Sequence, residues 1–170
     1  MTTANRPGNF VLFRLCSVVF PIVVLCCANP EEDTVAAALR RLSTGKGDLA
    51  NLSVTYDDMH GLWGGLTLQI RGDGTVNQQA VRQAAGEPRK VTREDLLKLV
   101  ALLIKHQAWE QRVPDRRRLQ DESRAHLTIA YESQTAEIWE WYNDLEKNNR
   151  ILEVRNLMEH IAWGKPPKKN

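Results

Sequence analysis

The acidic and histidine side chains best placed to act together are Asp57, Asp58 and His60, which lie within a span of four residues. Two carboxylates beside an imidazole could act as general acid and base in a hydrolase. They could also chelate a divalent cation, but hard-cation sites usually gather more oxygen ligands than this segment offers. We therefore predict no metal, no cofactor and no enzymatic activity, and keep the hydrolase as the weakest of three hypotheses.

Other motifs that carry chemistry in enzymes have the wrong context in this chain. The glycines of 61–65 lie between two predicted strands, whereas a phosphate-binding loop joins a strand to a helix. No serine lies in a G-x-S-x-G turn. All three cysteines precede residue 28, so the rest of the chain has no disulfide, thiolate zinc site or cysteine nucleophile.

One basic cluster is a candidate for binding. Arg116, Arg117 and Arg118 are consecutive in a charged loop over residues 110–124. Such a cluster could meet an acidic partner or anionic lipid headgroups. The acidic residues beside it favour the alternative of a solvated loop with mixed charges.

An aromatic group is the second candidate. It comprises Trp63, Trp139, Trp141 and Tyr142. If Trp139 and Trp141 point away from the helices, they form an exposed patch of the kind that binds partners. The alternative is that they fill the core while Ile138 faces outward, and strand alternation by itself leaves both arrangements open.

The N-terminal segment, residues 1–28, is predicted to be an apolar signal or anchor helix. Arg6 and Arg14 precede an apolar run over residues 15–28 that Pro21 interrupts. A basic start followed by about 7–15 apolar residues is typical of a secretory signal, and the run is shorter than the roughly 20 residues that span a bilayer. We expect an exported protein.

The end of this run, Val24-Leu25-Cys26-Cys27, resembles the signal of bacterial lipoproteins. The resemblance implies a lipid on Cys27 and attachment to the membrane of the cell envelope, although Cys26 stands where glycine or alanine is usual. Two alternatives stay open, namely release after a small-x-small site at residues 26–28 and retention as an uncleaved anchor.

The charge of the remaining chain gives no support for nucleic-acid binding. Without Arg6 and Arg14, the 23 basic residues fall to 21, which equals the 21 acidic residues. A formally neutral domain lacks the positive surface that nucleic-acid partners require.

The elements that must position these groups follow from periodicity. Alternating apolar residues predict strands over 52–56 and 66–70, a third strand from residue 75, and a hairpin over 127–131 and 136–142. Helical spacing predicts helices over 92–106 and 151–161. We expect an α+β domain over 52–163, in which an antiparallel sheet of about four to five strands carries two helices on one face. Residues 29–51 are interpreted as a flexible spacer with a short helix at most over 34–42, and 164–170 as a disordered basic tail.

Three motifs together carry a family resemblance. The turn Gly72-Asp73-Gly74-Thr75-Val76, the helix start over 91–96 and the closing helix are similar to small β-β-α-β-β-α domains of exported proteins and lipoproteins of unknown function. More distantly, residues 52–163 resemble the emfourin-type inhibitors of thermolysin-like metallopeptidases.

Two binding functions remain after these exclusions. The leading expectation is a non-enzymatic domain, attached to the membrane through its N-terminus, that binds another envelope protein or envelope component. The resemblance alone implies the alternative partner, a peptidase that the domain inhibits.

Overall fold

The computed structural model describes residues 34–60, 65–80, 87–112, 116–147 and 149–164. The predicted signal over 1–28, with Cys27, lies outside these residues, as do Trp63 and the end of the tail. Within the described ranges, no helix has both the length and the apolarity needed to cross a membrane.

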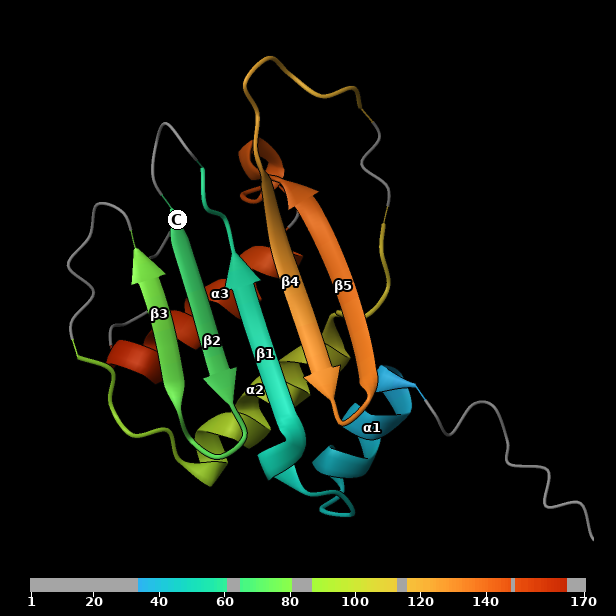
Figure 1. Ribbon diagram of the computed structural model, residues 1–170. Coiled ribbons are helices and arrows are strands. Elements are labelled where there is room, and N and C mark those ends of the chain that lie inside the picture. Colours follow the sequence, from blue (N-terminus) through green and yellow to red (C-terminus); the bar gives the residue numbers. More distant parts are fainter. Residues whose placement is uncertain (1–33, 61–64, 81–86, 113–115, 148, 165–170) are drawn as a thin grey trace, which may run out of the picture.

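A five-stranded antiparallel sheet in the order β3-β2-β1-β4-β5 confirms the predicted α+β class (Figure 1). The strands and helices are α1 (Val35–Ser43), β1 (Leu52–Asp57), β2 (Leu66–Arg71), β3 (Val76–Ala80), α2 (Arg93–Lys105), β4 (Arg124–Tyr131), β5 (Gln134–Trp141) and α3 (Arg150–Trp163). Short 3-10 turns lie at Leu49–Asn51 and Tyr142–Asp144.

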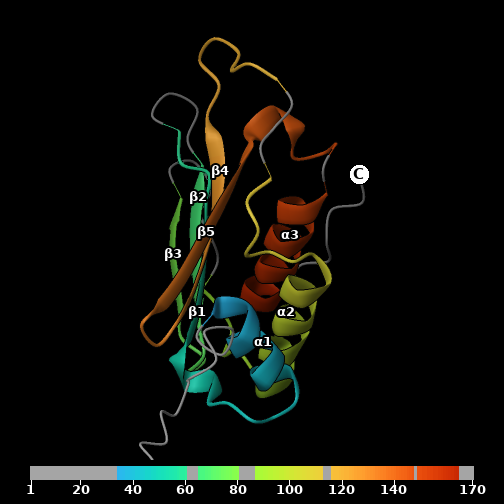
Figure 2. The same ribbon diagram turned by 90° about the vertical axis from the view of Figure 1, so that its right-hand side faces the viewer.

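The three helices α1, α2 and α3 all pack against the same face of this sheet (Figure 2). The core lies between the two layers, because alternate residues of each central strand point toward the helices. In β1, for example, Leu52, Val54 and Tyr56 are at most 2% exposed, while Ser53 and Thr55 between them are half-buried. The opposite face of the sheet therefore carries the polar residues of the alternation.

Helix α2 begins as predicted. Thr92 Oγ1 accepts a hydrogen bond from the backbone N–H of Asp95 at 3.2 Å, and the Asp95 carboxylate accepts one from the backbone N–H of Thr92 at 3.2 Å. This reciprocal capping satisfies two of the amide groups that a helix start leaves unpaired. Arg89 adds an ion pair to Asp95 at 3.1 Å.

Helix α1 matches the short helix that the sequence allowed over 34–42, but it packs on the sheet as a third helix, so the predicted number of two is wrong. Its apolar residues Val35, Ala38, Leu39 and Leu42 follow helical spacing and are at most 5% exposed. Thr34 caps its first turn by accepting a hydrogen bond from Ala37 N–H at 3.2 Å. An amphipathic helix of this kind gains stability by burying its apolar side, and α1 does so against the sheet and α2.

Candidate functional site: the open face of the sheet

The face of the sheet opposite the helices, here called the open face, is polar and crossed by hydrogen-bonded side chains. Thr67 Oγ1 donates to the Asp57 carboxylate at 3.0 Å. Gln69 donates to Ser53 Oγ at 3.0 Å and accepts from the Asn77 amide at 2.9 Å. These side chains come from neighbouring strands in register, so the pairing of β1, β2 and β3 decides which of them meet.

The β4–β5 half of the open face carries the histidine and the tryptophans. His126 Nδ1 and Glu137 Oε1 are 2.7 Å apart. Ile138 is fully buried toward the helices, so its neighbours Trp139 and Trp141 lie on the open face, as in the first of our two alternatives. The two tryptophan rings make an edge-to-face contact with centroids 5.0 Å apart.

Only one of the two tryptophans is accessible on this face. Arg124 stacks its guanidinium over both rings, 4.0 Å from the centroid of Trp139 and 4.9 Å from that of Trp141. Arg116 lies 5.5 Å from the Trp141 centroid. Trp141 is consequently 5% exposed although it stands outside the main core, while Trp139 stays half-buried. Tyr142, in the turn after β5, is 44% exposed.

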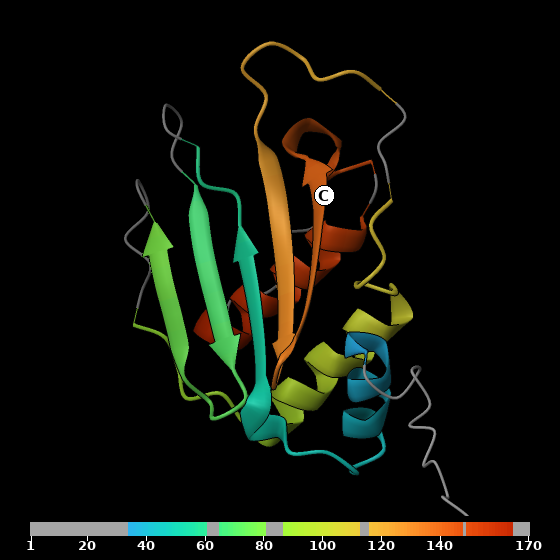
Figure 3. The same ribbon diagram turned by 45° about the vertical axis from the view of Figure 1, so that its right-hand side comes forward.

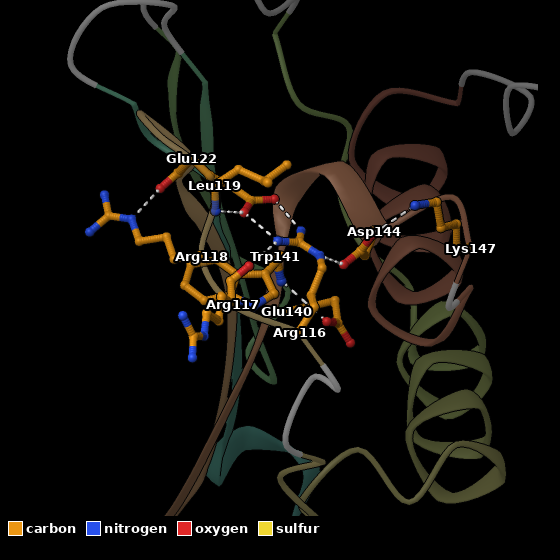
Figure 4. Close-up of polar contacts among 9 residues, drawn as sticks. All are labelled: Arg116, Arg117, Arg118, Leu119, Glu122, Glu140, Trp141, Asp144 and Lys147. Atoms are coloured by element: carbon orange, nitrogen blue, oxygen red, sulfur yellow. Dashed lines mark hydrogen bonds and ion pairs between the residues drawn. The ribbon is translucent and has the colours of Figure 1, made fainter.

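The three consecutive arginines do not form a single basic patch (Figure 4). Arg116 is held between two carboxylates: it forms a two-pronged ion pair with the buried Glu122 and a hydrogen bond of 2.5 Å to Asp144. The hydrogen bond from Arg116 holds the pKa of Glu122 below its ordinary value. Arg118 donates to the backbone carbonyl of Glu122 at 3.1 Å, and both Arg117 and Arg118 are exposed.

A hollow of about 420 Å³ adjoins Trp141 on the open face. Its lining combines apolar contact surface with charges of both signs: Asp57, Met59, Arg118, Glu122, Ser123, Arg124, His126 and Trp141. Sequence reasoning missed the part that Arg124 and His126 play here. Their alternation with buried Ala125 and Leu127 was the available signal, but only the pairing of β4 with β1 and β5 brings them beside Asp57 and the tryptophans.

In the segment that holds Asp57, Asp58 and His60, the two carboxylates point to opposite faces of the sheet. Asp57 lies on the open face and accepts from Met59 N–H at 3.0 Å, whereas Asp58 is 3% exposed and turns to the helix side. There it accepts from the Tyr56 hydroxyl at 2.7 Å and pairs with Arg155 at 3.3 Å. Strand alternation thus separates the two carboxylates. Among the described residues, no group of three His, Cys, Asp or Glu side chains could hold a metal ion.

Comparison of the chain with family models, curated proteins and solved structures found no match. The resemblance to emfourin-type inhibitors accordingly remains a prediction from the sequence.

Proposed function

We propose that this protein is an exported, non-enzymatic binding domain, attached to the cell envelope by a lipid on Cys27, that binds another protein through its open face. The observation that carries this proposal is the position of Trp139. It stands half-buried on the open face, in contact with Arg124 and Trp141, and these two residues line the 420 Å³ hollow. Protein-binding surfaces usually combine an accessible aromatic side chain with a rim of polar residues.

The electrostatics of the hollow indicate the kind of group that it receives. Arg116 already neutralises Glu122, whereas Arg118 and Arg124 bring positive charge to the same lining. Stacking on the two tryptophans holds the Arg124 guanidinium in place, so little side-chain entropy remains to be lost on binding. We expect the partner to present a carboxylate beside an apolar side chain, with the carboxylate on Arg124 and the apolar group against Trp139.

A photo-crosslinking experiment tests the binding surface. A photoreactive amino acid replaces Glu137, which flanks Trp139, in the full chain expressed in the cells that produce it. The matched control places it at Glu94 on α2, whose side chain is 78% exposed. We expect the Glu137 position to crosslink to one protein and the Glu94 position not to, and Trp139→Ala to remove that product. Identical products from both positions would contradict the proposal.

The same experiment decides between the two kinds of partner. If the crosslinked protein is a thermolysin-like peptidase, purified domain should slow its turnover and Trp139→Ala should restore it. Undiminished turnover at saturating domain would exclude the inhibitor that the resemblance implies.

Mass spectrometry of the mature N-terminus tests the anchor separately. We expect a diacylglycerol-modified Cys27 as the first residue, lost in Cys27→Ala and kept in Cys26→Ala. An unmodified N-terminus would contradict lipidation without affecting the binding proposal.

A further inference from the structure

A second hollow, of about 320 Å³, lies where α2 ends and α3 begins, away from the open face. Five of its six lining residues are Lys, Arg or His: Lys105, His106, Arg112, Lys147 and Arg150, with Asn149 as the sixth. Its volume falls in the range of small-molecule sites. A concave surface lined in this way attracts anions.

Arg150 is the buried member of this lining. The residue is 5% exposed, and its Nη1 donates to the backbone carbonyl of Glu110 at 2.9 Å. Its Nε and Nη2 have no hydrogen-bond partner among the described residues, although together these atoms carry three N–H donors. Buried polar groups in folded proteins are nearly always hydrogen-bonded, so donors of this kind indicate a partner that is still to be supplied.

Arg150 feels charges of both signs from its surroundings. Burial, and next the positive charge of Arg112, hold the pKa of Arg150 below its ordinary value, although Glu140 and Glu110 act in the opposite direction. The Arg112 guanidinium donates to the neutral amide oxygen of Gln107 at 3.4 Å. The hollow therefore brings two guanidinium groups to one concave surface.

Nearby acidic residues already have other partners. The Glu153 carboxylate pairs with Lys105 at 3.1 Å and with His106 at 2.8 Å. Asp144 is shared between Lys147, at 3.1 Å, and Arg116. These pairs fix three of the cationic side chains around the hollow without filling it.

The start of α3 adds donors of its own. Its N-cap residue, Asn149, makes no side-chain hydrogen bond to the first turn of this 14-residue helix. The N–H groups and the helix dipole at such a start favour an anion.

We propose that this hollow binds a phosphate group, either as inorganic phosphate or as the phosphodiester of a lipid headgroup. A phosphate offers several acceptor oxygens to donors that converge from different directions, and guanidinium groups bind it through paired hydrogen bonds. This site is independent of the open face, because its lining residues come from other segments of the chain.

Titration calorimetry of the full chain in an uncharged detergent tests the site with inorganic phosphate as the probe. Sodium chloride at the same ionic strength and pH is the control. We expect saturable binding of phosphate in the titration. In thermal unfolding, phosphate should raise the Tm of the protein and chloride should not. Equal effects of phosphate and chloride would overturn the proposal.

Matched variants locate the binding. Arg112→Gln and Lys147→Gln remove exposed charges that line the hollow, and each should weaken phosphate binding about tenfold. Arg117→Gln removes an exposed charge elsewhere and should leave the affinity unchanged. If all three variants weakened binding equally, the proposed site would be wrong. Arg150→Lys should also bind more weakly, and if it fails to fold, Arg112→Gln and Lys147→Gln still decide the question.

A second titration distinguishes the two sources of phosphate. Glycerophosphoglycerol, the water-soluble headgroup of phosphatidylglycerol, carries a phosphodiester. Tighter binding of this compound than of inorganic phosphate supports a lipid headgroup as ligand, and the reverse order supports free phosphate. If the protein binds neither compound, the proposal fails.

Discussion

Asp58 shows how a side chain that suggests catalysis in the sequence becomes structural in the fold. Its carboxylate accepts the Tyr56 hydroxyl and the backbone N–H of Leu66, at 2.7 and 2.6 Å, and faces Arg155 at 3.3 Å. It thereby joins the β1–β2 end of the sheet to α3. Burial, as the largest influence, raises the pKa of Tyr56, so this phenol stays protonated and keeps donating to Asp58.

We predict that Asp58→Asn destabilises the protein by about 2 kcal/mol, because Arg155 then loses one of its two carboxylate partners and keeps Glu159 at 2.9 Å. Chemical denaturation followed by circular dichroism measures the change. Asp57→Asn is the matched control: its carboxylate is half-buried on the open face, and we expect a loss of about 1 kcal/mol or less. Equal losses in the two variants would contradict the assignment of opposite faces.

Glu122 should give the protein part of its sensitivity to acid. The hydrogen bond from Arg116 lowers the pKa of Glu122 from its ordinary value of 4.5. The folded protein therefore binds this proton more weakly than the unfolded chain does, so the stabilisation is present above about pH 4.5 and is lost as the pH falls through and below that value.

We predict that Glu122→Gln is less stable than the wild type at pH 7, and that its stability falls less steeply between about pH 5 and pH 3. Urea unfolding across this pH range measures both effects. Asp144 and Glu153 also have lowered pKa values, from hydrogen bonds with Arg116 and His106 respectively, so some acid sensitivity should remain in the variant. If the unfolding free energies of the wild type and the variant fell in parallel with pH, Glu122 would not contribute to the acid sensitivity.

At the scale of elements, α1 shortens the chain segment that connects the folded domain to its expected anchor. With the helix packed into the core from Val35 onward, about seven residues separate Cys27 from the folded domain. Even a fully extended chain of this length spans at most about 25 Å. If Cys27 carries a lipid, the domain lies close to the membrane surface.

We predict that Leu39→Ala in α1 costs about 3 kcal/mol of unfolding free energy, because it leaves a cavity at a fully buried position. Arg41→Ala, on the exposed side of the same helix, should change stability by no more than about 0.5 kcal/mol. Both are measured by chemical denaturation. A negligible loss for Leu39→Ala would restore the interpretation of this stretch as a spacer.

Strand β5 lies at one edge of the sheet (Figure 3), and at Trp139 a side chain occupies that edge. The Gln111 amide accepts from the backbone N–H of Trp139 at 2.7 Å and donates to its carbonyl at 3.1 Å. These contacts imitate a strand at an edge that would otherwise offer both groups to another chain. A partner that binds at Trp139 is therefore expected to use the open face and not to extend the sheet.

At the scale of the whole molecule, the helices cover one face of the sheet and form the core with it. The open face is left for the proposed binding. Ile138 and Trp139 are neighbours in β5 but point to opposite faces of the sheet. Substitutions at these two positions should therefore have opposite consequences.

We predict that Ile138→Ala destabilises the protein by about 3 kcal/mol and leaves the partner's affinity for the folded protein unchanged. Trp139→Ala should cost only about 1 kcal/mol, from its contacts with Arg124 and Trp141, and remove the crosslink described above. Denaturation and crosslinking measure the two effects. A larger stability loss for Trp139→Ala than for Ile138→Ala would indicate that the faces are reversed.

The sequence by itself determined the local elements, because they follow from periodicity and end signals within short segments. Alternation predicted the strands, and the Thr92–Asp95 cap predicted the start of α2. Tertiary structure alone decided which face of β5 is buried, since alternation defines two faces without saying which one meets the helices. It also made α1 part of the core, and it brought Lys105 and Arg112 to the start of α3. Those contacts join distant segments through burial of a shared core, which local spacing does not specify.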